Sequence, residues 1–159
     1  MEVQSLSPDL RSWANALVAQ HFGSTSVVSR DVLHDVSLLP ALVAISGGQP
    51  LGVLHYRLDD DECEIVSLVA ATSGLGAGSS LVKAICGLAA ESGCERLWLV
   101  TTNDNSAAQD FYRARGFSRI SIYPGAVAAA RLLKPEIPLV GQNGIPIEDE
   151  IEYELALRT

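Results

Sequence analysis

The stretch Thr72–Val82, TSGLGAGSSLV, places three glycines, at positions 74, 76 and 78, between an apolar run and an amphipathic segment. Glycine adopts left-handed backbone conformations and allows other groups to approach the main chain closely. Where a strand ends and a helix begins, free backbone N–H groups and the helix dipole together favour an anion. The stretch therefore predicts a phosphate-binding loop, and a glycine-rich turn without a ligand is the alternative.

Two widespread phosphate-loop patterns do not fit this stretch. The dinucleotide pattern GxGxxG fails because its last glycine would fall on Ser79 or on Leu81, depending on where the pattern starts. The P-loop pattern fails because no lysine follows Gly78. Ser79 and Ser80 add hydroxyl donors, and the stretch has no Lys or Arg. The sequence therefore predicts a phosphate loop that contains no cationic side chain.

The segments before the loop predict one clear helix and three strands. Ser7 is suited to cap a helix that has Pro8 at its first position and ends at Gly23. A short second helix is expected within residues 24–40. Apolar and β-branched runs predict strands over three ranges: 41–46, 51–58 and 62–70.

The segments after the loop alternate between helices and strands. Leu81, Ile85, Leu88 and Ala89 recur at helical spacing, so a helix is expected over 79–93. The remaining chain predicts a central strand at 95–102, a helix at 103–116, a strand at 117–123, a helix at 124–134, a loop, and a strand at 151–157. This order predicts a mixed α/β (α+β) fold in three layers, with residues 1–159 as a single domain.

A second motif, NSAAQDFYRARGF, follows at residues 105–117. Together with the loop, it resembles the GNAT superfamily of acyl-CoA-dependent N-acetyltransferases. The family pattern Asn-x-x-Ala-x-x-Phe-Tyr-x-x-x-Gly-Phe is filled by Asn105, Ala108, Phe111, Tyr112, Gly116 and Phe117. Gly76 and Gly78 match the family loop pattern Gln/Arg-x-x-Gly-x-Gly/Ala, whereas Ser73 replaces its usual Gln or Arg.

The resemblance implies a GNAT-like fold and acetyl-CoA as co-substrate. Its mostly antiparallel central sheet would contain two splayed parallel strands, here residues 62–70 and 95–102, with helices on both sides. The pantetheine arm would bind where these strands part, and a backbone N–H near Leu68 or Val69 would polarise the thioester carbonyl. The resemblance implies further cofactor contacts from Ser73, Gly74, Leu75, Gly76, Ala77, Gly78, Ser79 and Asn105. Asn105 is equally suited to cap its helix.

The implied reaction is attack by a primary amine on the thioester, for which the amine must lose a proton. By family position, Tyr112 would protonate or hydrogen-bond the departing sulfur, and a core tyrosine is the alternative. Strand alternation puts Glu62, Glu64 and Leu68 on one face, so either glutamate is a candidate to accept the proton through water. Solvated carboxylates at the start of a strand are the alternative for both.

Composition restricts the choice of partners. The net charge is -8, and no cluster of Lys and Arg forms a track for nucleic acid. Because neither a signal peptide nor a membrane-spanning run is evident, we expect a cytoplasmic protein without nucleic-acid or membrane partners. The three cysteines form no metal-binding pattern, so no metal is expected. His21 is expected to pack on the apolar stripe of the first helix. His55 shares a strand face with Val53 and Arg57, for which the acceptor side is one option, and no histidine is assigned a catalytic role.

The sequence does not identify the acceptor of the acetyl group. Four classes are compatible with it: a small amine, an antibiotic, a peptide N-terminus and a protein lysine. Segment 124–150 is proline-rich and longer than a minimal family member requires, so we expect it to shape an acceptor pocket or a subunit contact, for instance in a homodimer. The alternative function is an acyl-CoA-binding regulatory module without turnover.

Overall fold

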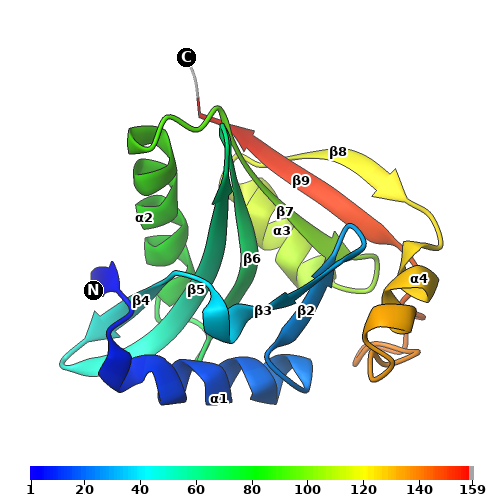
Figure 1. Cartoon of the computed structure of the whole chain (residues 1–159), viewed down its shortest axis with the longest axis horizontal. Coiled ribbons are helices and arrows are strands. Elements are labelled where there is room, and N and C mark those ends of the chain that lie inside the picture. Colours follow the sequence, from blue (N-terminus) through cyan, green and yellow to red (C-terminus); the bar gives the residue numbers. More distant parts are fainter. Residues whose placement is uncertain (158–159) are drawn as a thin grey trace.

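The computed structural model describes residues 1–157 and is built around one seven-stranded sheet (Figure 1). The first half of the chain forms β1 (Glu2–Ser5), the 3-10 turn η1 (Pro8–Leu10), α1 (Arg11–Phe22), β2 (Ser26–Ser29), β3 (Val32–Asp35), the 3-10 turn η2 (Val36–Leu38), β4 (Ala41–Ser46), β5 (Gln49–Asp59) and β6 (Glu62–Ala70). The second half forms α2 (Ala77–Glu91), β7 (Arg96–Thr102), α3 (Ser106–Ala114), β8 (Ser118–Tyr123), α4 (Ala126–Leu133) and β9 (Glu150–Ala156).

The strand order of the large sheet is β1-β4-β5-β6-β7-β9-β8. All neighbouring strands are antiparallel except β6 and β7, which are parallel. Helices α2 and α3 cover one face, and α1 packs on the other face (Figure 1). The predicted mixed α/β fold, with three layers and a parallel strand pair, is confirmed.

Apolar side chains fill the space between these layers on both faces of the sheet. On one face, Leu81 and Ile85 of α2 are fully buried against Leu54 and Leu97. On the other face, Val18 of α1 belongs to a second cluster that includes Val36, Val53 and Val66. Burying such a side chain contributes about 1.5–3 kcal/mol to the free energy of folding. Both clusters therefore hold the sheet firmly between its helices.

The parallel strands β6 and β7 pair over only a short register in the described chain. The register runs from Glu62 opposite Arg96 to Glu64 opposite Trp98. Beyond these residues β6 continues along β5, and β7 continues along β9, so the two strands separate. Sheet strands normally satisfy each other's backbone polar groups, so the gap leaves main-chain groups available to a ligand.

A β-bulge at Val66 changes which residues of β6 share a face. His55 of β5 pairs with Ser67, whereas the next residue, Tyr56, pairs with Ile65, so Val66 is an extra residue. Val66 therefore packs in the core under α1, but Leu68 packs in the core under α2. The prediction that alternation keeps Glu64 and Leu68 on one face is wrong, because one inserted residue reverses the alternation.

Residues 24–40 contain a β-hairpin and a 3-10 turn instead of the helix expected there. Strands β2 and β3 are joined through Arg30 and Asp31, whose φ angles of 47° and 68° are left-handed. Two consecutive left-handed residues make the turn that best matches the twist of a hairpin. The sequence concealed this turn because neither position carries the Gly or Asn that usually marks it.

The first helix also starts later than its sequence indicates. Ser7 precedes η1 and makes no side-chain capping hydrogen bond, and α1 itself begins at Arg11. Gly23 ends α1 in a left-handed conformation, as predicted. Strand β1, which pairs with the edge of β4, was not expected from the sequence.

Candidate active site

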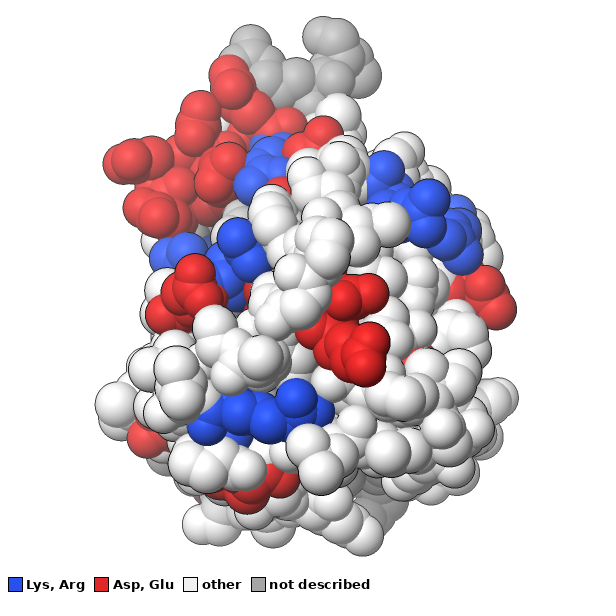
Figure 2. Space-filling view, turned by 90° about the vertical axis from the view of Figure 1, so that its right-hand side faces the viewer, with Lys and Arg blue, Asp and Glu red and all other residues white. Residues whose placement is uncertain are grey.

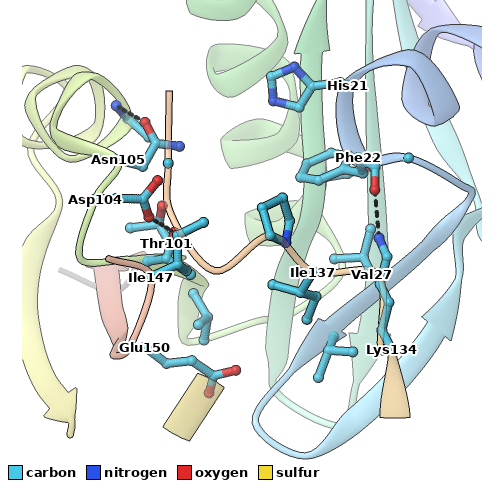
Figure 3. Close-up of a pocket in the computed structure, with 18 of the residues that line it drawn as sticks. His21, Phe22, Val27, Thr101, Asp104, Asn105, Lys134, Ile137, Ile147 and Glu150 are labelled. Carbon is cyan, nitrogen blue, oxygen red and sulfur yellow. Dashed lines mark hydrogen bonds between the residues drawn. The ribbon is translucent and has the colours of Figure 1, made fainter. Parts of the chain in front are cut away.

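A cavity of about 530 Å³ lies where β6 and β7 part (Figure 3). Residues 65–68 of β6 and 99–102 of β7 form its two strand walls. Residues 21–23 at the end of α1 and Tyr112 of α3 contribute further wall. Such cavities between separated elements are the usual sites of small-molecule binding, and their size is typically about 300–1,000 Å³.

The glycine-rich loop follows β6 and leads into α2, as predicted, and its glycines have different tasks. Gly74 and Gly76 adopt left-handed conformations, with φ angles of 84° and 83°, and Gly76 is the N-cap residue of α2. Gly78 lies in the first turn of α2, where a Cβ atom would come within 3.0 Å of the Phe111 ring. Two glycines therefore shape the loop, and the third lets α3 pack closely against it.

Arg115, at the end of α3, lies against the first turn of α2. Its guanidinium donates hydrogen bonds to the Ser79 hydroxyl and, at 2.8 Å, to the Phe111 carbonyl. The same group stacks on the Phe111 ring, 3.6 Å from its centroid. The loop itself contains no cationic side chain, as the sequence indicates, but the fold places the guanidinium of Arg115 beside it.

Tyr112 lines the cavity from α3 and is only 6% exposed. Its ring contacts Phe111 and Phe117 edge-on, with centroid distances of 5.1 and 5.3 Å. Burial raises the pKa of the Tyr112 phenol, with a smaller opposing effect from Arg115. The phenol is thus a neutral hydrogen-bond donor over the whole physiological pH range.

Two other residues expected near the cofactor also lie on the cavity wall. Leu68 does so from β6, next to the gap between the parallel strands. Asn105 caps α3, because its side-chain oxygen accepts a hydrogen bond from the Ala108 N–H at 3.1 Å, and it lines the cavity as well. Capping therefore does not remove Asn105 from the site.

The two glutamates considered as general bases do not line the cavity. Glu64 is fully buried and accepts hydrogen bonds from Ser29 at 2.6 Å and from Arg57 at 2.7 Å. Glu62 accepts one from Arg96 at 2.7 Å at the end of the sheet where β6 and β7 are still paired. The structure therefore holds both carboxylates in ion pairs away from the gap.

Glu150, which the sequence did not single out, is the buried carboxylate of the cavity. It is 3% exposed, begins β9, and lies opposite Thr102 of β7. Its Oε1 atom accepts hydrogen bonds from the Arg30 guanidinium at 2.9 Å and from the Arg30 N–H at 3.3 Å. Arg30 in turn stacks on Tyr123, 3.3 Å from the ring centroid. Figure 3 shows the Glu150 carboxylate pointing into the cavity.

The segment after α4, residues 134–149, covers one side of the cavity and is tied down at both ends. Lys134 is buried and donates hydrogen bonds to the carbonyls of Phe22 and Ser26, as Figure 3 shows for Phe22. Near the other end, Asn103 bonds to the Pro146 carbonyl and to two backbone N–H groups, those of residues 148 and 149. Several residues of this segment, among them Lys134, Ile137 and Ile147, line the cavity. This position agrees with the expectation that the segment helps to shape a pocket.

The histidines lie elsewhere than the sequence indicates. His55 is fully buried and shares a 3.1 Å hydrogen bond with Ser67, and burial lowers its pKa to about 4. It therefore does not face the acceptor side. His21 is exposed at the mouth of the cavity, edge-on to Phe22, rather than packed in the core.

The surface and the remaining side chains add three observations on residues 1–157. On the face in Figure 2, acidic side chains gather toward one corner and basic ones lie in separate groups, not in a continuous track. No three His, Cys, Asp or Glu residues within this range are placed to hold a metal ion. Among its helices, none combines the length and apolar character that a bilayer crossing requires.

Comparison of the sequence with known proteins agrees with this geometry. The model of the acetyltransferase (GNAT) family matches residues 10–117. A Bacillus subtilis (strain 168) protein named "Uncharacterized protein YdhI" is 37% identical to this chain over 136 residues, or 85% of each chain.

Two solved structures have the same fold. The ribosomal-protein-S18-alanine N-acetyltransferase from Escherichia coli superposes with a TM-score of 0.70 at 16% identity, over 99% of this chain and 94% of that one. A Bacillus subtilis acetyltransferase in complex with CoA also gives a TM-score of 0.70, at 17% identity, over 99% and 97% of the two chains. At these identities the likeness concerns the fold alone.

Proposed function

We propose a reaction for this chain, which belongs to the acetyltransferase (GNAT) family and is thus an acyltransferase. In it, the nitrogen of a primary amine attacks the thioester of acetyl-CoA directly and takes over the acetyl group. One domain spanning residues 1–159 would carry the whole reaction. The observation that supports this most is the cavity between the parted strands, which has Tyr112 on its wall and a glycine loop at the end of β6.

The loop fits a diphosphate. Gly74 and Gly76 leave the main chain open to close approach, and the first N–H groups of α2 have no partner within their own helix. Arg115 adds a guanidinium at Ser79, in place of the family's usual Gln or Arg at position 73. Ser73, Leu75 and Ala77 would contribute mainly through their backbone.

The thioester would enter the gap between β6 and β7, with a backbone N–H near Leu68 or Val69 polarising its carbonyl. Such a donor typically contributes about 3 kcal/mol to lowering the barrier. The amine nitrogen forms a bond to the carbonyl carbon, the carbon–sulfur bond breaks, and the nitrogen loses its proton. Tyr112 would donate a hydrogen bond to the departing thiolate. Its raised pKa favours this role over complete proton transfer.

We propose that the proton of the amine passes to a group other than Glu62 or Glu64. An alkylammonium has a pKa near 10.4, so only about one molecule in 2,500 is neutral at pH 7. Both glutamates are held by arginines away from the cavity, whereas Asp104, Glu136 and Glu150 line it. One of these three carboxylates is therefore the candidate acceptor of the proton.

Two measurements on the purified protein test this function. Calorimetric titration with acetyl-CoA should show binding, and a panel of primary amines should release free CoA thiol. Tyr112→Phe should lower kcat by roughly 100-fold with little change in the Kd of acetyl-CoA, because a positioned proton donor acts in the transition state. Tyr56→Phe, which alters a partly buried tyrosine away from the cavity, should behave as the wild type.

The outcome also separates the enzyme from a regulatory module. Binding of acetyl-CoA without CoA release from any amine would favour the module. Unchanged kcat in Tyr112→Phe would remove the assigned role of the tyrosine and leave transfer itself in place.

The three free cysteines support a reducing compartment, the cytoplasm, as the place of action.

A further inference from the structure

We infer that the acceptor is a small-molecule amine with an apolar body, and that Glu150 binds its ammonium group. This rests on the proposed acetyl transfer and adds the class of acceptor to it. Two independent features carry it: the closed wall made by residues 134–149, and a buried carboxylate inside that wall.

The wall limits the size of the acceptor. Residues 134–149 lie across the cavity, held by Lys134 at one end and by Asn103 at the other. Between them, Arg131 donates hydrogen bonds to the carbonyls of Pro138 and Ile147, at 2.8 Å each. Because the same 530 Å³ must also hold the thioester end of the cofactor, only part of it is left for the acceptor. A polypeptide would need an open groove on this side instead.

The lining defines the body of the acceptor. Five apolar side chains line the cavity together with Glu150 and Lys134: Phe22, Val27, Ile137, Val140 and Ile147. Figure 3 labels four of them, Phe22, Val27, Ile137 and Ile147. The Lys134 ammonium donates two of its three hydrogens to the carbonyls of Phe22 and Ser26. An uncharged, apolar body suits these side chains.

An unoccupied carboxylate oxygen favours a cation at Glu150. Two separate sets of ion pairs lie along β9: Arg30 pairs with Glu150, and Arg96 pairs with Glu62, Glu152 and Glu154. Both hydrogen bonds of Glu150 within residues 1–157 end on Oε1, so Oε2 is left for a ligand in the cavity. A buried carboxylate gains most from a charged hydrogen-bond partner.

Glu152, two residues further along β9, provides a matched comparison. It is almost equally buried, and both of its oxygens are occupied: Tyr123 donates to Oε1 at 2.8 Å and Arg96 donates to Oε2 at 3.0 Å. It does not line the cavity. Glu152→Gln thus reproduces the loss of a buried charge on this strand without touching the proposed ammonium site.

The test is an NMR titration of the isotope-labelled protein, with and without CoA. The ligands are benzylamine and its neutral analogue benzyl alcohol, butylamine and 1-butanol, and two short peptides, one with a free N-terminus and one with a lysine. The proteins are the wild type, Glu150→Gln, Glu150→Asp and Glu152→Gln, each checked for its thermal unfolding midpoint. Thiol release with acetyl-CoA is measured on the same set.

In the wild type and Glu152→Gln, each amine should bind about tenfold or more tightly than its alcohol, the effect of one charge-assisted hydrogen bond. Glu150→Gln should lose that preference, Glu150→Asp should keep part of it, and the peptides should bind at least about tenfold more weakly than benzylamine. Retained preference in Glu150→Gln, equal binding of peptides, or no binding of any small amine would overturn the inference. Failure of CoA to bind would instead count against the proposed function. In that case the amine titration of the protein without CoA still tests whether Glu150 binds the ammonium group.

Discussion

Arg115 shows how a single side chain joins two parts of the site. It connects the end of α3 to the first turn of α2 and stacks on Phe111, which itself packs against Gly78. Tyr112, the next residue after Phe111, lines the cavity. The same helix therefore positions both the phosphate loop and the proposed proton donor.

Replacing Arg115 should weaken acetyl-CoA binding specifically through the phosphates. Arg115→Leu is expected to raise the Kd of acetyl-CoA roughly tenfold, the lower end for losing a charged hydrogen bond in a partly exposed site. The KM of S-acetyl-pantetheine, which has no diphosphate, should not change. Calorimetry and steady-state kinetics measure the two quantities.

Two further variants make this expectation specific. Arg113→Leu removes an exposed arginine of the same helix and should leave the Kd of acetyl-CoA unchanged. Adding Ser73→Arg to Arg115→Leu should restore binding, because it returns a cation to the usual family position. If Arg115→Leu raises the KM of both acetyl donors equally, the residue supports the fold and not the phosphates.

His55 makes the stability of the protein depend on acidity. Its folded-state pKa of about 4 is lower than the value of about 6.5 in an unfolded chain, because burial disfavours the charged ring. Between these values the unfolded chain binds a proton that the folded chain does not. The free energy of unfolding should therefore decrease as the pH falls from 6.5 to 4, by about 3 kcal/mol in total from this residue.

Denaturant unfolding between pH 4 and pH 7 measures this effect. His55→Asn keeps a polar partner for Ser67 and should be less stable at neutral pH but show a flatter pH dependence over this range. The difference between the two proteins isolates His55 from the carboxylates and from His34, whose pKa is also lowered by burial. A difference that is constant with pH would contradict the assignment.

At the scale of elements, the main determinant of the site is how strands and segments are joined. The bulge at Val66 redirects Leu68 toward the α2 side of the sheet, next to the gap between β6 and β7. The β2–β3 hairpin places Arg30 at Glu150, and the segment after α4 closes the remaining side. The hairpin and the segment are held by polar contacts, whereas Val66 at the bulge packs in the apolar core.

Lys134 is the contact that ties α4 to α1 and β2. Lys134→Met would leave the carbonyls of Phe22 and Ser26 without their donor, at a cost of about 1–3 kcal/mol in the free energy of unfolding. We expect the KM of amine acceptors to rise, because the wall loosens, while the Kd of acetyl-CoA stays the same.

Thermal unfolding, amine kinetics and calorimetry check these three quantities. Lys83→Met removes an exposed lysine on α2 and serves as the control for the loss of a positive charge. An equal rise in the Kd of acetyl-CoA would mean that Lys134 supports the whole fold and not the wall alone.

At the scale of the whole molecule, the net charge of -8 should assist a cationic acceptor. Salt shortens the reach of this field, from about 10 Å at 0.1 M to about 3 Å at 1 M. The kcat/KM of a cationic amine should therefore fall several-fold across this range, because attraction raises the encounter rate. The kcat/KM of hydroxylamine, which is mostly neutral at pH 7.5, should change little. Equal salt effects on both nucleophiles would show that the field acts on the cofactor or on the fold.

Features that depend on neighbouring residues were readable from the sequence. The left-handed turns at Gly74 and Gly76, the helical spacing of α2 and the end of α1 at Gly23 each follow from a few consecutive residues. The layered fold with its parallel strand pair followed from the order of these elements together with the family pattern at 105–117. Local conformational preferences and burial periodicity are properties of short segments, so the sequence alone determined this much.

The tertiary structure decided which distant residues meet. Glu64 is held by Ser29, 35 residues away, Arg115 reaches Ser79 across 36 residues, and Arg30 reaches Glu150 across 120. The hairpin turn at Arg30 and Asp31 brings Arg30 to Glu150, and the packing of Phe111 on Gly78 brings Arg115 to Ser79. A one-residue change of register moves a side chain to the opposite face of a sheet, so contacts of this kind depend on the path of the whole chain.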